Sequence, residues 1–169
     1  MERVLVVFYS QRGHTRKLAE AVARALGADL EEIREPTDRS GLLGYLRSGT
    51  EALLGVSAEI ARPKRDAGRY DLVVVGTPVW AASVSPPART YLWLERERLP
   101  AVALFCTMGG TGDARAFGQM AAIAGKKPIA TLAVREAEIA RGAPREKVAA
   151  FAAALAGKGR KRGRARAAA

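Results

Sequence analysis

Four short, nearly unbroken apolar runs mark the chain, at residues 4–8, 72–75, 101–107 and 129–134. Runs of this length predict strands that are buried on both faces of a sheet. A fifth segment, residues 29–34, alternates between polar and apolar positions and predicts a shorter strand. Its charged residues suit the edge of the sheet.

Helical spacing of apolar residues follows each of these runs. The first helix presents Leu18, Val22 and Leu26 on one face. Residues 41–55 are predicted to be helical with a possible break, because Gly44 and Gly49 weaken a continuous helix. Residues 56–70 read as a charged connection. Further helices are predicted from 87 to 94, from about 114 to 123, and from 145 to about 155–157.

Strands and helices therefore alternate five times along the chain. This alternation predicts an α/β fold, a doubly wound three-layer sandwich in which right-handed crossovers cover both faces of a five-stranded parallel sheet. In the strand order 2-1-3-4-5, a ligand crevice lies at the carboxyl ends of the strands. The loops after the first, third and fourth strands should meet there.

The loop after the first strand, YSQRGHT at residues 9–15, has the composition of a phosphate cradle. The start of a helix carries unpaired N–H groups and a partial positive charge, which favour an anion. Ser10 and Thr15 offer hydroxyl groups, Gly13 allows close approach of the backbone, and Arg12 can balance a phosphate charge. The alternative is a plain strand-to-helix turn capped by Ser10. The stretch matches neither the Walker nor the dinucleotide-binding glycine pattern.

Length and composition favour one domain without disulfide or zinc. A chain of 169 residues with 49% hydrophobic residues has enough apolar surface for a single core. Cys106 has no second cysteine to pair with and is expected to be a buried, inert thiol, while His14 lacks further metal ligands. We expect neither a secretory signal nor a transmembrane helix, which predicts a cytoplasmic protein.

The formal net charge of +11 is concentrated at the C-terminus, where residues 157–169 hold six cations and no anion. With glycine and alanine as its other residues, this segment is predicted to be a disordered tail that follows a folded domain at residues 1–156. It is expected to be a solvated appendage. The alternative is weak, non-specific contact with nucleic acid or another polyanion.

The motifs YSQRGHT, DLVVVGTPVWA and LFCTMGG give the chain a resemblance to the flavodoxin family across residues 3–156. The resemblance implies a flavodoxin-like fold with bound FMN and no catalytic side chain. It implies that the first loop holds the phosphate through Ser10, Arg12, Gly13, His14 and Thr15. It also implies that two further loops line the flavin ring, through Thr77, Pro78, Val79, Trp80 and Ala81 and through Thr107, Met108, Gly109, Gly110 and Gly112.

Among these residues Trp80 is the expected stacking partner of the ring, because a flavin is a flat apolar plate with polar edges. The alternative is a tryptophan folded into the core beneath its loop. We interpret His14 as a neighbour of the phosphate and not as a catalytic base. The glycines of the third loop are equally consistent with a simple turn.

Two departures from electron-carrying flavodoxins bear on function. Residues 108–113 include no aromatic side chain, and the chain without its tail has a net charge of +5. An uncovered ring face leaves room for a nicotinamide or a quinone. We therefore favour an FMN-dependent oxidoreductase that takes electrons from NAD(P)H or a protein donor and passes them to a quinone-like or protein acceptor. The alternatives are a one-electron carrier and a flavin-free binding module.

Overall fold

The computed structural model describes residues 3–36, 58–142 and 144–167. Its sheet has the order β2-β1-β3-β5-β6, formed by β1 (Val4–Phe8), β2 (Asp29–Glu32), β3 (Leu72–Trp80), β5 (Ala101–Met108) and β6 (Thr131–Arg135). All of these neighbours pair in parallel. Counted among the five parallel strands, this is the predicted order 2-1-3-4-5. The flavodoxin-like fold is confirmed.

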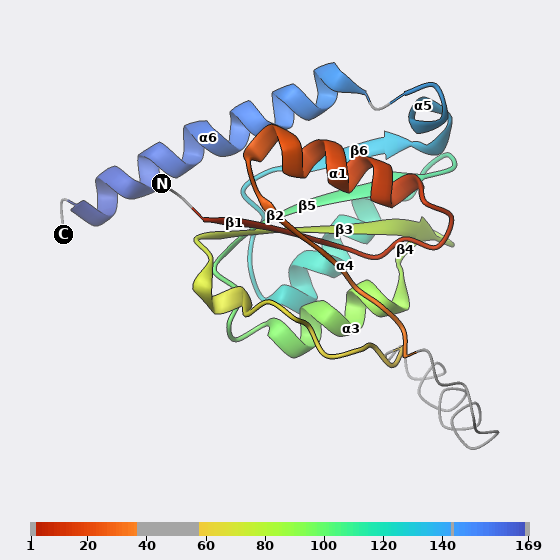
Figure 1. Ribbon diagram of the computed structural model, residues 1–169, viewed down its shortest axis with the longest axis horizontal. Helices are drawn as coiled ribbons and strands as arrows, with labels where there is room; N and C mark the ends of the chain where they lie inside the picture. The colour runs from red at the N-terminus through yellow and green to blue at the C-terminus, as the bar shows by residue number, and fades with distance from the viewer. Residues whose placement is uncertain (1–2, 37–57, 143, 168–169) are drawn as a thin grey trace.

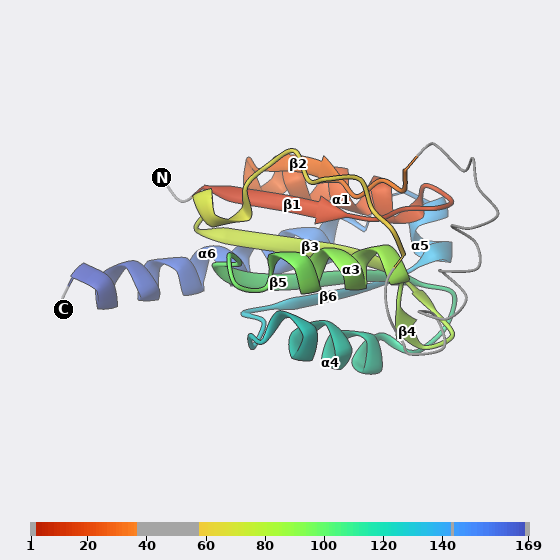
Figure 2. The ribbon, with the colours of Figure 1, turned by 90° about the horizontal axis from the view of Figure 1, so that it is seen from below.

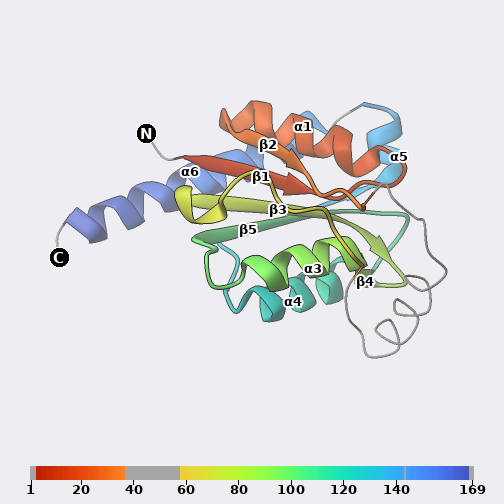
Figure 3. The same ribbon diagram turned by 60° about the horizontal axis from the view of Figure 1, so that its bottom comes forward.

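Helices cover both faces of the sheet, as Figure 1 shows. On one face lie α1 (His14–Leu26), α5 (Glu136–Ala140) and α6 (Arg145–Ala167), and on the other lie α3 (Pro86–Glu95) and α4 (Asp113–Ala124). Figure 3 turns α3 and α4 toward the viewer. A short 3-10 turn, η1 (Ala67–Arg69), precedes β3.

The alternation of side chains along β1 explains the two cores. Leu5 and Val7 belong to the cluster beneath α3 and α4, whereas Val6 and Phe8 belong to the cluster beneath α1 and α6. β3 and β5 are buried on both faces, which accounts for their continuous apolar sequences. Together the two clusters produce the three layers seen in Figure 1, and Figure 2 looks onto the face of the sheet that α3 covers.

A glycine in the centre of the sheet makes one close contact possible. Gly76 in β3 lies opposite Phe105 in β5, and a Cβ atom at Gly76 would lie 1.9 Å from Cζ of that ring. Because no side chain fits in this space, residue 76 must be glycine for Phe105 to occupy its place in the core.

The structure differs from the local predictions at two places before α6. β3 continues to Trp80 instead of ending at residue 75, and a two-residue strand β4 (Ser83–Val84) pairs with it antiparallel. The short helix α5 lies where no helix was predicted, stabilised by the Glu138 carboxylate, which accepts a hydrogen bond from the backbone N–H of Arg135. The predicted helix at residues 41–55 lies outside the described residues.

The end of α6 also differs from the prediction, which placed it near residues 155–157. The helix continues to Ala167, and its C-terminal part extends beyond the sheet (Figure 1). Alanine, arginine and lysine are strong helix formers, and isolated glycines weaken a helix without ending it. Among the described residues, no helix combines the length and apolar character that crossing a bilayer demands.

Candidate functional site

Three loops meet at the carboxyl end of the sheet, after β1, β3 and β5 (Figure 2). Two contacts join them. The hydroxyl groups of Thr15 and Thr107 lie 2.8 Å apart, which connects the start of α1 to the end of β5. The site of a Cβ atom on Gly112 would be 2.7 Å from Cα of Ala82, which places the third loop directly against the second. The sequence prediction that these loops converge is therefore confirmed.

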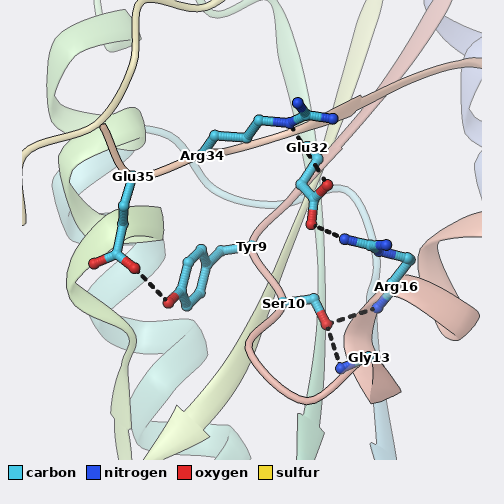
Figure 4. Close-up of polar contacts among 7 residues, drawn as sticks. All are labelled: Tyr9, Ser10, Gly13, Arg16, Glu32, Arg34 and Glu35. Atoms are coloured by element: carbon cyan, nitrogen blue, oxygen red, sulfur yellow. Dashed lines mark hydrogen bonds and ion pairs between the residues drawn. The ribbon is translucent and has the colours of Figure 1, made fainter. Parts of the chain in front are cut away.

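The turn after β1 is closed by Ser10, as Figure 4 shows. Its Oγ accepts hydrogen bonds from the backbone N–H groups of Gly13, at 3.1 Å, and Arg16, at 3.2 Å. Gly13 precedes α1 with a φ of 89°, in the left-handed region where glycine is favoured. Ser10 thus caps the helix start, and its hydroxyl proton is still available to a ligand.

The same turn presents several donors to the rim. The guanidinium group of Arg12 is exposed, and neither it nor the backbone N–H groups of His14 and Thr15 have a partner among the described residues. The nearby Arg16 is engaged instead, because it forms an ion pair with Glu32 at 2.5 Å (Figure 4). The turn therefore offers its unused donors at the positive end of a helix.

Two predicted phosphate or ring contacts have buried side chains. Thr15 is 1% exposed and Thr107 is fully buried, and each satisfies the hydroxyl of the other. A ligand on the rim can reach Thr15 through its backbone N–H, but the hydroxyl groups form part of the core. The sequence could not distinguish a hydroxyl on the rim from one beneath it.

His14 lies at the side of the turn, toward α5. Its Nδ1 is 3.5 Å from a carboxylate oxygen of Glu136 but has no hydrogen bond, and the atom itself is buried. The arrangement holds the imidazole against α5 instead of directing it across the crevice. This position suits a neighbour of the turn and gives no support to a catalytic base.

The second loop is anchored by Thr77. Its buried hydroxyl lies 2.8 Å from the Ser85 hydroxyl, accepts a hydrogen bond from the Ser85 N–H at 3.1 Å, and donates one to the Pro78 carbonyl. Thr77 thus fixes the return of the chain into α3, and its side chain is used internally. Pro78 is also buried, next to Thr107 in the sheet.

A two-residue hairpin carries the next part of this loop. Trp80 pairs with Ser83, and between them Ala81 and Ala82 have φ values of 47° and 58°. Such turns favour asparagine and glycine, because a Cβ atom in the left-handed region is strained. Gln119 of α4 holds the hairpin by accepting the Val84 N–H at 3.0 Å. The strain lies at the tip of the predicted ring site.

Trp80 is half-buried and touches Tyr9. The two rings meet edge to face, with centroids 5.8 Å apart and an interplanar angle of 85°. The Tyr9 hydroxyl donates a hydrogen bond to Glu35 at 3.1 Å (Figure 4). Trp80 also packs against the cluster beneath α3 and α4. The first loop therefore orients the tryptophan. Its ring is partly exposed, as stacking on a flavin requires, and partly packed on the core, as the alternative interpretation predicted.

The third loop is open and small. Met108 is half-buried, Gly109 and Gly110 are exposed, and a Cβ atom on either glycine would meet no atom within 4 Å. Gly112 is different, because its φ of 112° and its contact with the hairpin both require glycine. Val79, beside Gly112, completes the wall between the two loops.

Cys106 lies beneath this loop and is fully buried. Burial, with a smaller contribution from Asp113, raises the pKa of its thiol to about 12. The side chain is therefore protonated at neutral pH and unreactive, as expected from the sequence.

The whole arrangement, a parallel sheet with a donor-rich first turn and three loops that meet at its carboxyl end, matches a known family. The NADPH-dependent FMN reductase family aligns with residues 3–137. The chain belongs to this family.

Similar proteins agree with this membership. Among curated proteins, two NAD(P)H dehydrogenases (quinone) are each 34% identical to the chain, one from Archaeoglobus fulgidus over 110 residues and one from Cupriavidus metallidurans over 95. The alignment with the Archaeoglobus protein covers 57% of this FMN reductase family member and 56% of the relative. The alignment with the Cupriavidus protein covers 54% of this chain and 46% of the relative. The chain thus spans about half the length of the curated relatives it matches.

Solved structures show the same fold. A flavoprotein in complex with FMN from Lactobacillus acidophilus is 26% identical, with a TM-score of 0.65, 83% of this chain covered and 98% of that one. Flavodoxin 2 from Bacillus cereus is 19% identical, with a TM-score of 0.56 and coverage of 92% and 99%. The second likeness concerns the fold alone.

Sequence analysis of this family member missed the residues that hold the loops in place. Tyr9 orients Trp80, Ser85 pairs with Thr77, and Gln119 ties α4 to the hairpin. Tyr9 stands at the beginning of the YSQRGHT motif, which was a usable signal. Gln119 lies on a helix with no local signal, and only the tertiary structure brings it to β4.

Proposed function

We propose that this protein uses FMN to transfer electrons from NAD(P)H to a quinone-like acceptor. FMN binding and redox chemistry accord with its family. The observation that supports a substrate-using enzyme is the open third loop, in which Gly109 and Gly110 are exposed and residues 108–113 have no aromatic side chain. A ring covered by Trp80 on one side would leave its other face accessible to a second planar molecule.

The first turn fits the FMN phosphate. The Ser10 hydroxyl, the Arg12 guanidinium group and the N–H groups of His14 and Thr15 supply donors, and a Cβ atom on Gly13 would meet nothing within 4 Å. A phosphate monoester carries about −1.5 to −2 charges, which the helix start and Arg12 offset. In this proposal the Thr15 hydroxyl takes no part, because it is buried against Thr107.

The second and third loops would hold the ring. Trp80 provides the apolar face, and the hairpin at Ala81 and the loop at Met108 provide backbone groups around the ring edge. Pro78, Val79 and Gly112 shape the wall, whereas Thr77 and Thr107 contribute through their backbone because their side chains are buried. When bound, FMN supplies the hydride and electron chemistry.

The chain's own residues would then orient and shield the reactants. No described side chain in the crevice is placed as an acid or base, since His14 faces Glu136 and Cys106 is buried. The rate would depend on how closely the nicotinamide and then the quinone approach the exposed ring face, which is the contribution of positioning. We also propose a cytoplasmic location, where the single thiol would remain reduced.

The decisive experiment combines flavin binding with turnover. FMN and riboflavin are titrated into flavin-free protein, and oxidation of NADH and NADPH is then followed with and without a soluble benzoquinone. Preferential binding of FMN and quinone-dependent NAD(P)H oxidation are expected. Binding of FMN without NAD(P)H oxidation would point to a one-electron carrier, and absence of flavin binding to a binding module. Equal affinity for the two flavins would contradict the phosphate cradle.

A further inference from the structure

A groove between α1 and the first turns of α6 lies apart from the proposed flavin site. It has a volume of about 670 Å³ and is bordered by Arg24 of α1 and by Arg141 and Arg145 beside the start of α6. Figure 1 shows the two helices side by side on this face of the sheet, and their residues are in contact. The floor is formed by small apolar residues, including Ala21, Ala25 and Val148.

The three arginines are exposed, and within the described part of the chain none forms an ion pair. No carboxylate borders the groove. Of the acidic residues on the adjoining helices, Glu138 is held by Lys147 at 2.6 Å and Glu136 faces His14. Glu20 of α1 and Glu146 in the first turn of α6 do not line the groove and form no ion pair among the described residues. The groove is thus lined by positive charge that is not neutralised by its own walls.

The sequence of α6 adds further positive charge beyond the groove. This helix spans 23 residues, about 34 Å at 1.5 Å per residue, and its sequence from 158 to 166 adds six cations. A small anion would occupy the groove alone. A helix whose sequence carries many cations beyond the groove matches instead a ligand with regularly repeated negative charges.

We propose that the groove and α6 form a surface that binds the phosphate backbone of nucleic acid without sequence preference. A lipid surface fits less well, because the chain beyond Leu155 has no side chain larger than alanine among its apolar residues. Stable binding to a bilayer needs an apolar face or a lipid anchor in addition to charge. Nucleic acid needs only the cations, each of which displaces counterions from a phosphate.

The test uses the full-length protein and a short labelled DNA duplex, with fluorescence anisotropy measured across a range of salt concentrations. The groove variant carries Arg24→Gln, Arg141→Gln and Arg145→Gln. The control carries Arg62→Gln, Lys64→Gln and Lys127→Gln, which are also exposed and remove the same charge from other surfaces. Far-UV circular dichroism and melting temperature verify that both variants are folded.

The groove variant should bind DNA at least about tenfold more weakly than the wild type at low salt. The slope of log affinity against log salt concentration should become less steep by about 2–3, since each lost phosphate contact removes about 0.9 from it. The DNA affinity of the control variant should stay within about threefold of the wild-type value. Equal losses in the two variants would show that the attraction is diffuse and would overturn the proposal. Tighter binding to vesicles of anionic phospholipid than to the duplex would assign the surface to lipid instead.

Discussion

Thr15 and Thr107 are separated by 91 residues in the chain, yet their buried hydroxyl groups share one hydrogen bond of 2.8 Å. The pair joins the start of α1 to the end of β5 directly beneath the rim. Neither hydroxyl reaches the crevice, so their contribution is to the geometry of the loops above them.

The first prediction follows from this pair. Thr15→Val or Thr107→Val alone should destabilise the protein by about 1–3 kcal/mol, because each leaves the other hydroxyl buried and unpaired. The double variant should cost less than the sum of the two, since both polar groups are then removed. Urea unfolding of all four proteins gives the coupling energy, and strict additivity would show that the two hydroxyl groups do not depend on each other.

The second prediction concerns the strained hairpin. Ala81→Gly and Ala82→Gly should each raise stability by about 0.5–1 kcal/mol, because relief of the left-handed strain exceeds the entropy that glycine adds to the unfolded state. Ala150→Gly, at an exposed position of α6, is the matched control and should lower stability by about 1 kcal/mol. Destabilisation by both hairpin variants, measured by denaturant unfolding, would argue against a strained turn.

The third prediction concerns pH. Burial raises the pKa of Glu95 above its ordinary 4.5, against the opposing effect of Arg98, which donates a hydrogen bond to one carboxylate oxygen at 2.6 Å. A raised folded-state pKa contributes stability that is present below pH 4.5 and is lost as pH rises through the folded value.

Glu95→Gln should therefore gain stability relative to the wild type as pH increases from about 4 to 7, and the two proteins should converge at low pH. Melting temperatures across this range provide the measurement. A difference that stays constant with pH would mean that the Glu95 carboxyl does not contribute to the pH dependence.

The fourth prediction separates the two ends of the flavin. Arg12→Ala should weaken FMN binding by about 10- to 100-fold, the value of a charge-assisted hydrogen bond, and leave riboflavin binding unchanged. Trp80→Ala should weaken both flavins by similar factors and shift the reduction potential of FMN, since stacking involves the ring. Arg62→Ala serves as the charge control. Identical behaviour of the Arg12 and Trp80 variants would refute the assignment of phosphate and ring ends.

The fifth prediction concerns Gln119, which reaches the hairpin from α4. Gln119→Leu removes the acceptor of the Val84 N–H and should lower affinity for FMN and riboflavin equally, because the ring side is disturbed and the phosphate turn is not. Gln119→Glu retains an acceptor at the same place and should restore most of the affinity. An effect confined to FMN would place the role of Gln119 elsewhere.

The sequence was sufficient to predict the fold and the rim because both depend on local signals. Continuous apolar runs such as 72–75 indicate buried parallel strands, and the fold constrains the loops that follow them. What escaped prediction depends on distant partners. The extension of β3 to Trp80 exists because β4 pairs with it, and pairing of two residues leaves no periodic pattern.

The candidate site shows the same division. The unused donors of the YSQRGHT turn follow from its position before α1, which the sequence made visible. The burial of Thr15, Thr77 and Thr107 could not be predicted in this way. The sequence around a threonine in a loop is the same whether its hydroxyl faces a ligand or another buried hydroxyl. Whether the fifteen predicted residues contact FMN stays a prediction that the binding experiments address.

The contact between Gly112 and Ala82 has a consequence for the kinetics of ligand capture. A Cβ atom on Gly112 would be 2.7 Å from the Ala82 Cα, so the third loop lies directly against the second. The hydrogen bonds between Ser85 and Thr77 in turn fix the second loop to the end of β3. An incoming flavin therefore has few backbone torsions left to immobilise. Binding would then cost little conformational entropy. Association rates should vary little among rim variants, and differences in affinity should be expressed in how long the flavin resides.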